Sequence, residues 1–489
     1  MTIGATLATA ASAYPEKPAF IMENRAVSYA VADALANCFS NALLSHGTDS
    51  GDRIAIIGHN SIEYAVAYFG IARAGGVSLH LSPRMTLEEI THCVETAGVK
   101  IAVCDPSVGQ INVDVRISME PAAFDSLYAN FSDVDPRREQ LIDSPSSATY
   151  TGGTTGYPKG ALHTARSRLT WATIAHDFFG LTPNDVMANA APMGHAAGGF
   201  IWFQPGVCAA ATQVLMPHWD VPKFIDLVER CCVSATFLVP AQIGMLLDHG
   251  AFNAERLRHL RKIVYGGAPT PLGLIERADC ALPECEFIQN YGMTEIGPLV
   301  TLYEQDRVLY PEALGRPTEH TECAIFTEPG KHAKPGEIGE LCFRGATLMT
   351  GFIGDPAQTE EFFRTGDGWG WTGDLAVMNE DKVISLVGRT KDMIISGGLN
   401  VYPAEIERVL MDVPVVLECA VFGIPDDILG ELPAAVIIAQ HATTAEEILT
   451  ACEIKMARHK RPRRIEFVEK IPKSPTGKVL RTALREQFG

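Results

Sequence analysis

Residues Tyr150–Gly160 read Y-T-G-G-T-T-G-Y-P-K-G, and they carry the strongest functional signal in the chain. Glycine tolerates positive φ angles, so several backbone N–H groups in such a stretch can converge on one anion. The threonine hydroxyls add donors to phosphate oxygens, and the lysine adds a positive charge beside them. We therefore expect a phosphate-binding loop made of Thr151, Gly152, Gly153, Thr154, Thr155, Gly156 and Lys159.

The spacing disfavours one well-known class of phosphate loop. In P-loop NTPases the lysine directly follows a glycine and precedes a serine or threonine. Here Tyr157-Pro158 separates Gly156 from Lys159, and Gly160 follows the lysine. The alternative is an ordinary surface loop that is rich in glycine and threonine and binds no ligand.

The composition describes a large acidic protein. The chain has 489 residues, 47% of them hydrophobic, which is enough for two or three structural units with their own cores. It has 58 acidic and 40 basic residues and a formal charge of −18, so nucleic acid is not an expected partner. One basic cluster, at 458–464, is either a solvated helix end or a docking place for a phosphorylated ligand such as CoA.

Cysteine usage and hydropathy bear on the compartment. The twelve cysteines include no C-x-x-C pair, so we expect reduced thiols in a cytoplasmic protein. Met1–Pro15 has no basic residue ahead of its apolar residues, which argues against a signal peptide. No apolar run reaches the roughly eighteen residues that a membrane span requires. The oligomeric state stays open, with a homo-oligomer as one option.

Strand-like apolar runs alternate with helical patterns through the N-terminal part of the chain. We expect a helix at Val31–Ala42, with Val31, Leu35, Cys38, Phe39 and Ala42 on its apolar face. The other expected elements are strands at Arg53–Ile57, Val99–Cys104, Asp185–Ala190, Thr236–Pro240 and Lys262–Tyr265, and helices at Glu63–Ala74 and Arg168–Phe179. This alternation predicts a layered α/β domain with mainly parallel strands. Residues 105–143 are weakly patterned and stay unassigned.

Two motifs that follow predicted strands suit a nucleotide. In Gly266-Gly267-Ala268-Pro269 the absence of Cβ atoms lets a flat ring approach the backbone, although a plain turn would have the same composition. In the run 289–295, Tyr291 offers a face for adenine, Thr294 a hydroxyl for the α-phosphate and Glu295 a hard oxygen ligand for Mg²⁺. Taken alone, the Thr-Glu pair would more often be a helix cap.

Two further motifs are ambiguous in isolation. The carboxylate of Asp374, in Trp371-Thr372-Gly373-Asp374, can accept both ribose hydroxyls, or it can simply form an Asx-turn. His195 follows a predicted strand in a stretch that begins Pro192-Met193-Gly194. A single histidine at a strand end is more often structural than functional.

Taken in order, these motifs resemble the signatures of the adenylate-forming superfamily, which includes acyl-CoA synthetases, peptide-synthetase adenylation domains and luciferases. The resemblance covers nearly the whole chain and is closest to acyl- and aryl-CoA synthetases. It implies that the catalytic residues are Lys478, Thr155, Glu295 and His195, with Glu295 as the Mg²⁺ ligand. Besides the phosphate loop, it implies nucleotide binding by Gly267, Ala268, Pro269, Asn290, Tyr291, Gly292, Met293, Thr294, Asp374 and Arg389.

The resemblance also implies an acyl pocket lined by His195, Gly199, Phe200, Phe203, Val239, Gly267, Gly292, Met293 and Gly297. The apolar side chains favour a hydrophobic acid, either medium-chain, alicyclic or aromatic. The glycines at 194, 198, 199, 267 and 297 suggest room for bulk. No Asp or Glu lies between Pro192 and Gln204 to pair with an ammonium group, so amino acids are not expected substrates. Gly194 stands where relatives carry an aromatic residue, so the chain departs from the family's pattern at this position of the pocket.

The C-terminal part of the chain predicts a different organisation. Strands at Ile338–Arg344 and Asp381–Val387 indicate a β-rich subdomain. Helices at Ala404–Met411 and Ala445–Ala457 with strands at Glu418–Phe422 and Ala434–Ala439 then indicate a small α+β domain. By resemblance, Lys391 is a hinge, the Gly397-Gly398 loop lies along the CoA channel, and Lys478 enters the active site. The predicted division is an N-terminal domain at 1–388, a hinge at 389–392 and a mobile C-terminal domain at 393–489.

The implied reaction is ATP-dependent ligation of a carboxylic acid to CoA through an acyl-adenylate, with ATP, Mg²⁺ and CoA required. One alternative is a stand-alone adenylating enzyme that loads an acyl carrier protein. Another, from a different class, is a catalytically silent nucleotide-binding protein on the same fold. The residue types at 155, 295, 374, 389 and 478 argue against the silent protein.

Overall fold

Two compact units make up the chain. The computed structural model describes all residues except 1, 139–140, 152–156, 453–454 and 474–478. The first unit comprises Met1–Glu322 and Phe343–Gly370, and the second comprises Cys323–Cys342 and Trp371–Gly489. The predicted hinge at 389–392 therefore falls within the second unit, and its role as a hinge stays a prediction.

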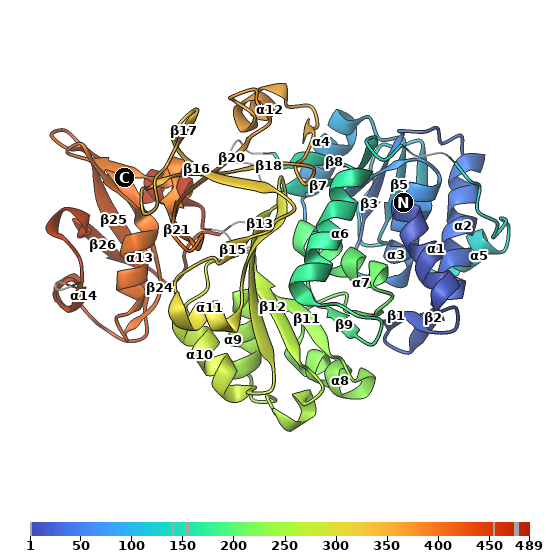
Figure 1. The fold of residues 1–489 in the computed structure, drawn as a ribbon, viewed down its shortest axis with the longest axis horizontal. Coiled ribbons are helices and arrows are strands. Elements are labelled where there is room, and N and C mark those ends of the chain that lie inside the picture. The colour runs from blue at the N-terminus through green and yellow to red at the C-terminus, as the bar shows by residue number, and fades with distance from the viewer. Residues whose placement is uncertain (1, 139–140, 152–156, 453–454, 474–478) are drawn as a thin grey trace. The chain divides into compact units, whose positions relative to one another are not determined.

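A nine-stranded sheet forms much of the first unit (Figure 1). The strands β9, β11, β12 and β13 are neighbours in this sheet, and each neighbouring pair among them is parallel. In sheet order the strands are β15 (Arg316–Pro317), β14 (Gly297–Leu302), β13 (Glu286–Met293), β12 (Lys262–Gly266), β11 (Ala235–Leu238), β9 (Val186–Asn189), β10 (Thr212–Leu215), β1 (Pro18–Met22) and β2 (Arg25–Ser28).

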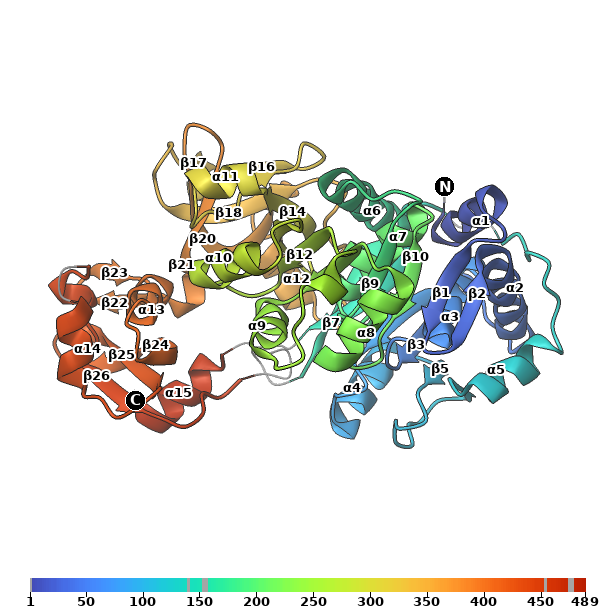
Figure 2. The ribbon, with the colours of Figure 1, turned by 90° about the horizontal axis from the view of Figure 1, so that it is seen from below.

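A seven-stranded sheet is the second layer of this unit (Figure 2). Its central strands are parallel and almost completely buried, which explains why apolar residues dominate their sequences. In sheet order the strands are β19 (Gly351–Phe352), β8 (Lys159–Thr164), β7 (Pro145–Thr151), β4 (Val77–Leu81), β3 (Arg53–Ile57), β5 (Ile101–Cys104) and β6 (Val115–Ser118).

Helices cover both faces of these sheets. One large core joins side chains of both sheets with those of α1 (Ile3–Ala13), α2 (Tyr29–Ser45), α3 (Ile62–Arg73) and α6 (Ala165–Phe179). Every residue of α3 is buried, as expected for a helix with protein on all sides. The other helices of the unit are α4 (Leu87–Ala97), α5 (Pro121–Tyr128), α7 (Gln204–Cys208), α8 (Val221–Cys231), α9 (Pro240–Asp248), α10 (Leu272–Ala281), α11 (Glu304–Leu309) and α12 (Pro356–Phe362).

The outer faces have cores of their own. Apolar residues of α8, α9 and α10 pack on the outer face of the nine-stranded sheet (Figure 1). Helix α4 packs in the same way on the outer face of the seven-stranded sheet. The first unit is therefore built of alternating helical and sheet layers, which confirms the predicted layered α/β class.

The second unit contains the β-rich part and the C-terminal part of the chain. A five-stranded sheet has the order β17 (Lys331–His332), β16 (Glu322–Glu328), β18 (Gly339–Arg344), β20 (Gly370–Met378) and β21 (Ile384–Arg389). A second sheet has the order β23 (Leu399–Val401), β22 (Ile394–Ser396), β25 (Gly430–Ala439) and β24 (Val416–Asp426), with β26 (Arg464–Phe467) paired to β25. The helices are α13 (Pro403–Met411), α14 (Ala445–Cys452) and α15 (Arg481–Phe488).

Two expectations from the sequence need correction, and one unassigned region can now be described. Val31 does not share the buried face of α2, because its side chain is 46% exposed. The helix expected at 445–457 ends at Cys452 in the described residues. The unassigned region 105–143 contains β6 and α5, and α5 has only one fully buried residue, Phe124, which explains the weak pattern.

Polar groups inside the first unit are held in specific hydrogen bonds. The ring of His80 on β4 lies 2.6 Å from the Tyr64 hydroxyl through Nδ1 and 2.9 Å from Ser78 Oγ through Nε2. Burial, and secondarily the charge of Arg168, lowers the pKa of His80 from 6.5 to about 3. His80 is therefore neutral in the folded protein at neutral pH. No helix among the described residues is both long and apolar enough to cross a bilayer.

This buried histidine predicts a pH dependence of stability. Below pH 6.5 the unfolded chain binds a proton at residue 80 and the folded chain does not, so acid destabilises the fold. The contribution of this residue to the free energy of unfolding should fall by about 1.4 kcal/mol between about pH 7.5 and pH 5.5. Denaturant titrations should show this fall in the wild type and a shallower pH dependence in His80→Gln. The control is His46→Gln, at an exposed position. An equal slope in wild type and His80→Gln would contradict the assignment.

Candidate functional site

The motifs of the first unit follow neighbouring strands of the nine-stranded sheet. The His195 stretch follows β9, Val239 follows β11, and the Gly267 turn follows β12. The run 289–295 forms the last residues of β13 and the turn that follows it. Because β9, β11, β12 and β13 are parallel, their carboxyl ends meet at one edge of the sheet. This edge is where open α/β sheets bind ligands.

Gly266 and Gly267 each suit their position in this turn for a different structural reason. A Cβ at Gly266 would lie 2.1 Å from the carbonyl oxygen of Asn290, so only glycine allows β12 and β13 to pair here. Gly267 has a φ of +80°, and the closest heavy atom to a Cβ there is Val239 Cγ1 at 4.0 Å. Gly267 and the following Ala268 and Pro269 are exposed. The turn therefore offers open backbone at the sheet edge, as a bound flat ring requires.

The β13–β14 hairpin carries the Y-G-M-T-E motif. Gly292 permits the close approach of the two strands, since a Cβ there would lie 2.0 Å from the carbonyl oxygen of Gly297. The side chain of Asn290 donates to the Val300 carbonyl and to Thr301 Oγ1, so it is used inside the hairpin. Tyr291, Met293, Thr294 and Glu295 are half-buried at its end. Their roles toward a nucleotide or a metal stay predictions.

A buried histidine fixes the end of this hairpin. His163 Nε2 lies 2.8 Å from the Thr294 carbonyl oxygen, and its Nδ1 lies 2.7 Å from Ser167 Oγ. Burial lowers the pKa of His163 well below 6.5, so the neutral ring donates from Nε2 to Thr294. His163 thus ties the first turn of α6 to the segment that carries Thr294 and Glu295.

His195 begins a π-helix, η1 (Ala196–Phe203). Helices of this type are rare and occur often at functional sites. Burial, and secondarily the charge of Arg84, lowers the pKa of His195, so the ring is neutral at neutral pH. The preceding loop is held by Asn60, which accepts from the Met193 N–H and donates to the carbonyls of Asn189 and Ala191.

The glycines of the predicted acyl pocket do not all leave space for a ligand. Cβ atoms at Gly198 and Gly199 would lie 2.2 Å from the Pro192 carbonyl oxygen and 2.3 Å from that of Met193. A Cβ at Gly297, where φ is +93°, would lie 2.5 Å from the Trp171 ring. The expectation that these three glycines provide room for bulk is therefore wrong, because protein atoms occupy the space. Gly267 alone among the pocket glycines faces open space.

The aromatic side chains of the predicted pocket are buried. Phe200 lies in edge contact with Trp171, with ring centroids 6.5 Å apart. Phe203 contacts Phe20 and Phe69, which gives it a role in the core, and its assignment to the pocket stays a prediction. Trp171 was not expected from sequence. It belongs to this region because its ring covers Gly297 and its Nε1–H donates to the Thr347 carbonyl.

Part of the predicted phosphate loop can be described. Thr151 ends β7 and Lys159 begins β8, in antiparallel register with each other. Lys159 Nζ lies 3.6 Å from Asp355 Oδ2. Gly152, Gly153, Thr154, Thr155 and Gly156 lie outside the described residues, and so does Lys478.

In the second unit, Asp374 on β20 and Arg389 on β21 are cross-strand partners. Arg389 Nε donates to Asp374 Oδ1 at 2.8 Å, and Asp374 is buried. The turn before Asp374 is held by Gly373 N–H, which donates to Glu340 Oε1, and by Thr372 Oγ1, which donates to the Leu341 carbonyl. Two residues predicted to bind ribose are therefore brought together within one sheet.

Lys391 and the Gly397-Gly398 pair also lie in the second unit. Lys391 is exposed in a single 3₁₀ turn. Gly397 and Gly398 have φ angles of +59° and +79° and connect β22 to β23 as a two-residue hairpin loop. Asp392, next to Lys391, pairs with Arg481 at 3.3 Å, so the predicted hinge is tied to the start of α15. The functions of the hinge and the loop stay predictions.

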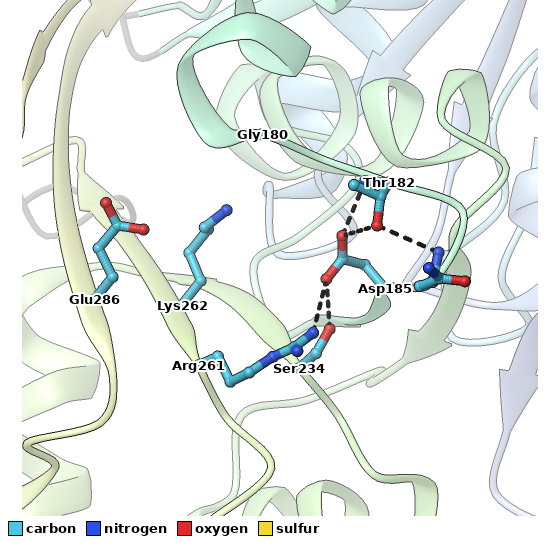
Figure 3. Close-up of a pocket in the computed structure, with 8 residues that line it drawn as sticks. Gly180, Thr182, Asp185, Ser234, Arg261, Lys262 and Glu286 are labelled. Carbon is cyan, nitrogen blue, oxygen red and sulfur yellow. Dashed lines mark hydrogen bonds and ion pairs between the residues drawn. The ribbon is translucent and has the colours of Figure 1, made fainter.

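A pocket of about 400 Å³ lies at the opposite end of the nine-stranded sheet (Figure 3). Its residues lie at or just before the first residues of β9, β11, β12 and β13. Asp185 accepts from Thr182 and Ser234 and lies 3.7 Å from Arg261, so these four polar residues are paired with one another (Figure 3). None of the predicted site residues lines this pocket, so it is separate from the candidate site.

Comparison with known proteins identifies the family. The model of the AMP-binding enzyme family matches residues 7–353, and that of the AMP-binding enzyme C-terminal domain matches residues 405–478. A fatty acid–[acyl-carrier-protein] ligase from Streptomyces coeruleorubidus is 32% identical over 97% of this chain and 94% of its own. A feruloyl-CoA synthase from an Amycolatopsis species is 32% identical over 95% of this chain and 94% of its own.

Solved structures agree with this assignment. The crystal structure of ATP-bound MatB from Rhodopseudomonas palustris is 29% identical and covers 100% of this chain and 99% of its own, with a TM-score of 0.91. The predictions of the superfamily and of the fold class are confirmed. The predicted enzyme class, an AMP-forming acid–thiol ligase that acts through an acyl-adenylate, is confirmed at the level of the family. The chain therefore belongs to the AMP-binding enzyme family.

Proposed function

We propose that this protein activates a hydrophobic carboxylic acid with Mg·ATP and transfers the acyl group to CoA. The observation that carries the proposal is the arrangement at the carboxyl edge of the nine-stranded sheet. There the His195 loop, the Gly267 turn and the Glu295 hairpin follow β9, β12 and β13, which are held in one parallel array. A ligand bound at such an edge contacts several loops that rigid strands position.

The reaction has two steps. A carboxylate oxygen of the acid attacks the α-phosphorus of ATP, and pyrophosphate leaves. The CoA thiol then loses its proton and attacks the carbonyl carbon of the acyl-adenylate, and AMP leaves with the oxygen that joined the two parts. Positioning and charge neutralisation supply most of the rate in phosphoryl chemistry of this kind.

The described residues supply only part of the ligand shell that Mg²⁺ requires. No group of three His, Cys, Asp or Glu side chains in the described part of the chain is placed to hold an ion. Mg²⁺ commonly takes one or two carboxylates and completes its shell with phosphate oxygens and water. Glu295 supplies such a carboxylate, and the ion, when bound, neutralises phosphate charge. Lys478 acts on the same charge from the C-terminal domain 393–489, which turns about Lys391 between the two steps.

CoA is the proposed acceptor, and a carrier protein is the second candidate. The relatives include both kinds of ligase by name, so family membership alone does not separate them. We favour CoA because the motifs of the chain resemble those of acyl- and aryl-CoA synthetases most closely. We place the activity in the cytoplasm because all twelve cysteines are free thiols in the structure.

The test is pyrophosphate release with Mg·ATP across a panel of medium-chain, alicyclic and aromatic acids, each with and without CoA. Continuous release that needs CoA, with acyl-CoA as product, supports the proposal. Release that stops near one equivalent despite CoA favours a carrier-protein acceptor. No release with any of these acids would contradict the proposal and favour the silent homologue.

Lys478→Ala should block adenylation and spare thioester formation. Removal of a cation that stabilises developing charge costs on the order of 10²–10³ in rate. Single-turnover pyrophosphate release should fall by that factor, while thioester formation from supplied acyl-adenylate and CoA should stay near the wild-type rate. Lys470→Ala, at an exposed position of the same domain, is the control. Equal losses in both half-reactions would remove Lys478 from its role.

Gly398→Asn should show the opposite pattern. Asparagine tolerates the positive φ of this position, and no heavy atom lies within 4 Å of a Cβ there, so the variant should fold. An added side chain in a thiol channel should slow the CoA step about tenfold or more and leave adenylation intact. Gly330→Asn is the matched control, because Gly330 has a φ of +77° and equally open surroundings. Equal thioester rates in the two variants would argue against the channel.

A further inference from the structure

A buried arginine stands next to the predicted acyl pocket. Arg168 lies on the second turn of α6 and is completely buried. Its Nε donates to Ser147 Oγ at 2.7 Å, and its Nη2 donates to Thr149 Oγ1 at 3.1 Å. Its Nη1 has no hydrogen-bond partner in the part of the chain that the structure describes. A guanidinium with an unused end is unusual at full burial, because unpaired buried donors are costly.

The charge of Arg168 is not balanced by a carboxylate. No ion pair among the described residues includes Arg168. The titratable groups that face it are Tyr68, His80 and His163, which burial keeps neutral at neutral pH. Burial lowers the pKa of Arg168 to about 9, so the guanidinium remains a cation. A buried cation whose neighbours are all neutral needs a compensating group from elsewhere.

Aromatic rings compensate only part of this charge. The guanidinium carbon lies 3.7 Å from the ring centroid of Phe200 and 4.4 Å from that of Trp171. These are favourable cation–π distances. An aromatic face, however, does not replace an oxygen atom as the acceptor of a directed hydrogen bond from a guanidinium N–H. Both hydroxyl partners, Ser147 and Thr149, are neutral. An oxygen acceptor for Nη1 is the missing component.

The two rings connect Arg168 to the acyl pocket. Phe200 belongs to η1, directly after the His195 loop, and is one of the pocket residues expected from sequence. Trp171 lies against Gly297, another of them. The guanidinium of Arg168 therefore contacts two rings that lie at or beside residues of the predicted acyl pocket.

We propose that Arg168 is a specificity-determining residue that binds an oxygen acceptor at the end of the acid remote from the activated carboxylate. This inference rests on the proposed function and narrows its substrate class. The preferred acid has an apolar body that contacts Phe200 and Trp171 and a terminal oxygen group. A second carboxylate is the strongest such group, because it accepts charge-assisted hydrogen bonds from a guanidinium.

The test uses pairs of acids of equal length. Each α,ω-dicarboxylic acid in a series is compared with the monocarboxylic acid that has a methyl group in place of the remote carboxylate, and kcat/KM is measured by pyrophosphate release with CoA present. Sites built to bind an oxygen reject the analogue that lacks it. At the best chain length the wild type should prefer the dicarboxylic member by about tenfold or more.

The variants separate recognition from structure. Arg168→Met, which is apolar and of similar length, should abolish or invert the preference, and Arg168→Lys should keep part of it because it retains the charge. Arg166→Met is the matched control, because Arg166 lies on the same helix but is exposed and paired with Asp143. It should leave the ratio of the paired acids unchanged.

Two results would overturn the inference. The first is a wild type that shows no preference for the dicarboxylic member at any chain length, and this result does not depend on whether a variant folds. The second is an Arg168→Met variant that changes both members of each pair by the same factor, as a purely structural residue would. In both cases turnover of the monocarboxylic acids leaves the proposed ligase intact. No release from either member of any pair would contradict the proposed function itself, and with it the inference.

Discussion

Parallel pairing of β9, β11, β12 and β13 is the constraint on which the site depends. Each of these strands must carry its connection back across the sheet, so the segments that leave their carboxyl ends are all presented at one edge. The His195 loop, the Gly267 turn and the Glu295 hairpin are far apart in sequence and share this edge for that reason. Helices on both faces bury the sheet and keep the array rigid.

Backbone proximity is the second feature that shapes the site. Gly266 and Gly292 let β12, β13 and β14 approach without a Cβ between them, and Gly198 and Gly199 let the π-helix pack on the carbonyls of the loop before it. The composition of these stretches alone does not distinguish a glycine that makes room for a ligand from one that makes room for another strand. Within the motifs that relate this chain to its family, some glycines are therefore needed for folding and others for binding.

Local patterns in the sequence predicted much of the architecture. The strand at Arg53–Ile57 was predicted with its observed bounds, because its residues Ile54–Ile57 form a short, buried apolar run. The Gly-rich motifs at 192–199 and 266–269 were placed directly after such apolar runs, and in the structure they lie at the ends of β9 and β12. Weakly amphipathic elements such as α5 were not predicted, since a helix with one fully buried residue leaves little periodicity to detect.

Long-range side-chain contacts could not be predicted. Asn60 holds the loop before His195 from a position more than a hundred residues earlier in the chain, and His163 holds the Thr294 carbonyl from the end of β8. Arg168 is one of two arginines on α6 and shows its full burial only when β7, α6 and η1 are assembled around it. A single sequence contains no signal for these long-range side-chain contacts, because they depend on which faces of the elements the fold brings together.

The central claim is that a carboxylate oxygen of the acid attacks the α-phosphorus of ATP. The most direct measurement is the fate of ¹⁸O from a doubly labelled carboxylic acid, followed by mass spectrometry of the nucleotide after turnover with Mg·ATP and CoA. One ¹⁸O should appear in the phosphate group of AMP and one should remain in the acyl-CoA. Unlabelled AMP, or the formation of ADP with the label in inorganic phosphate, would contradict the account.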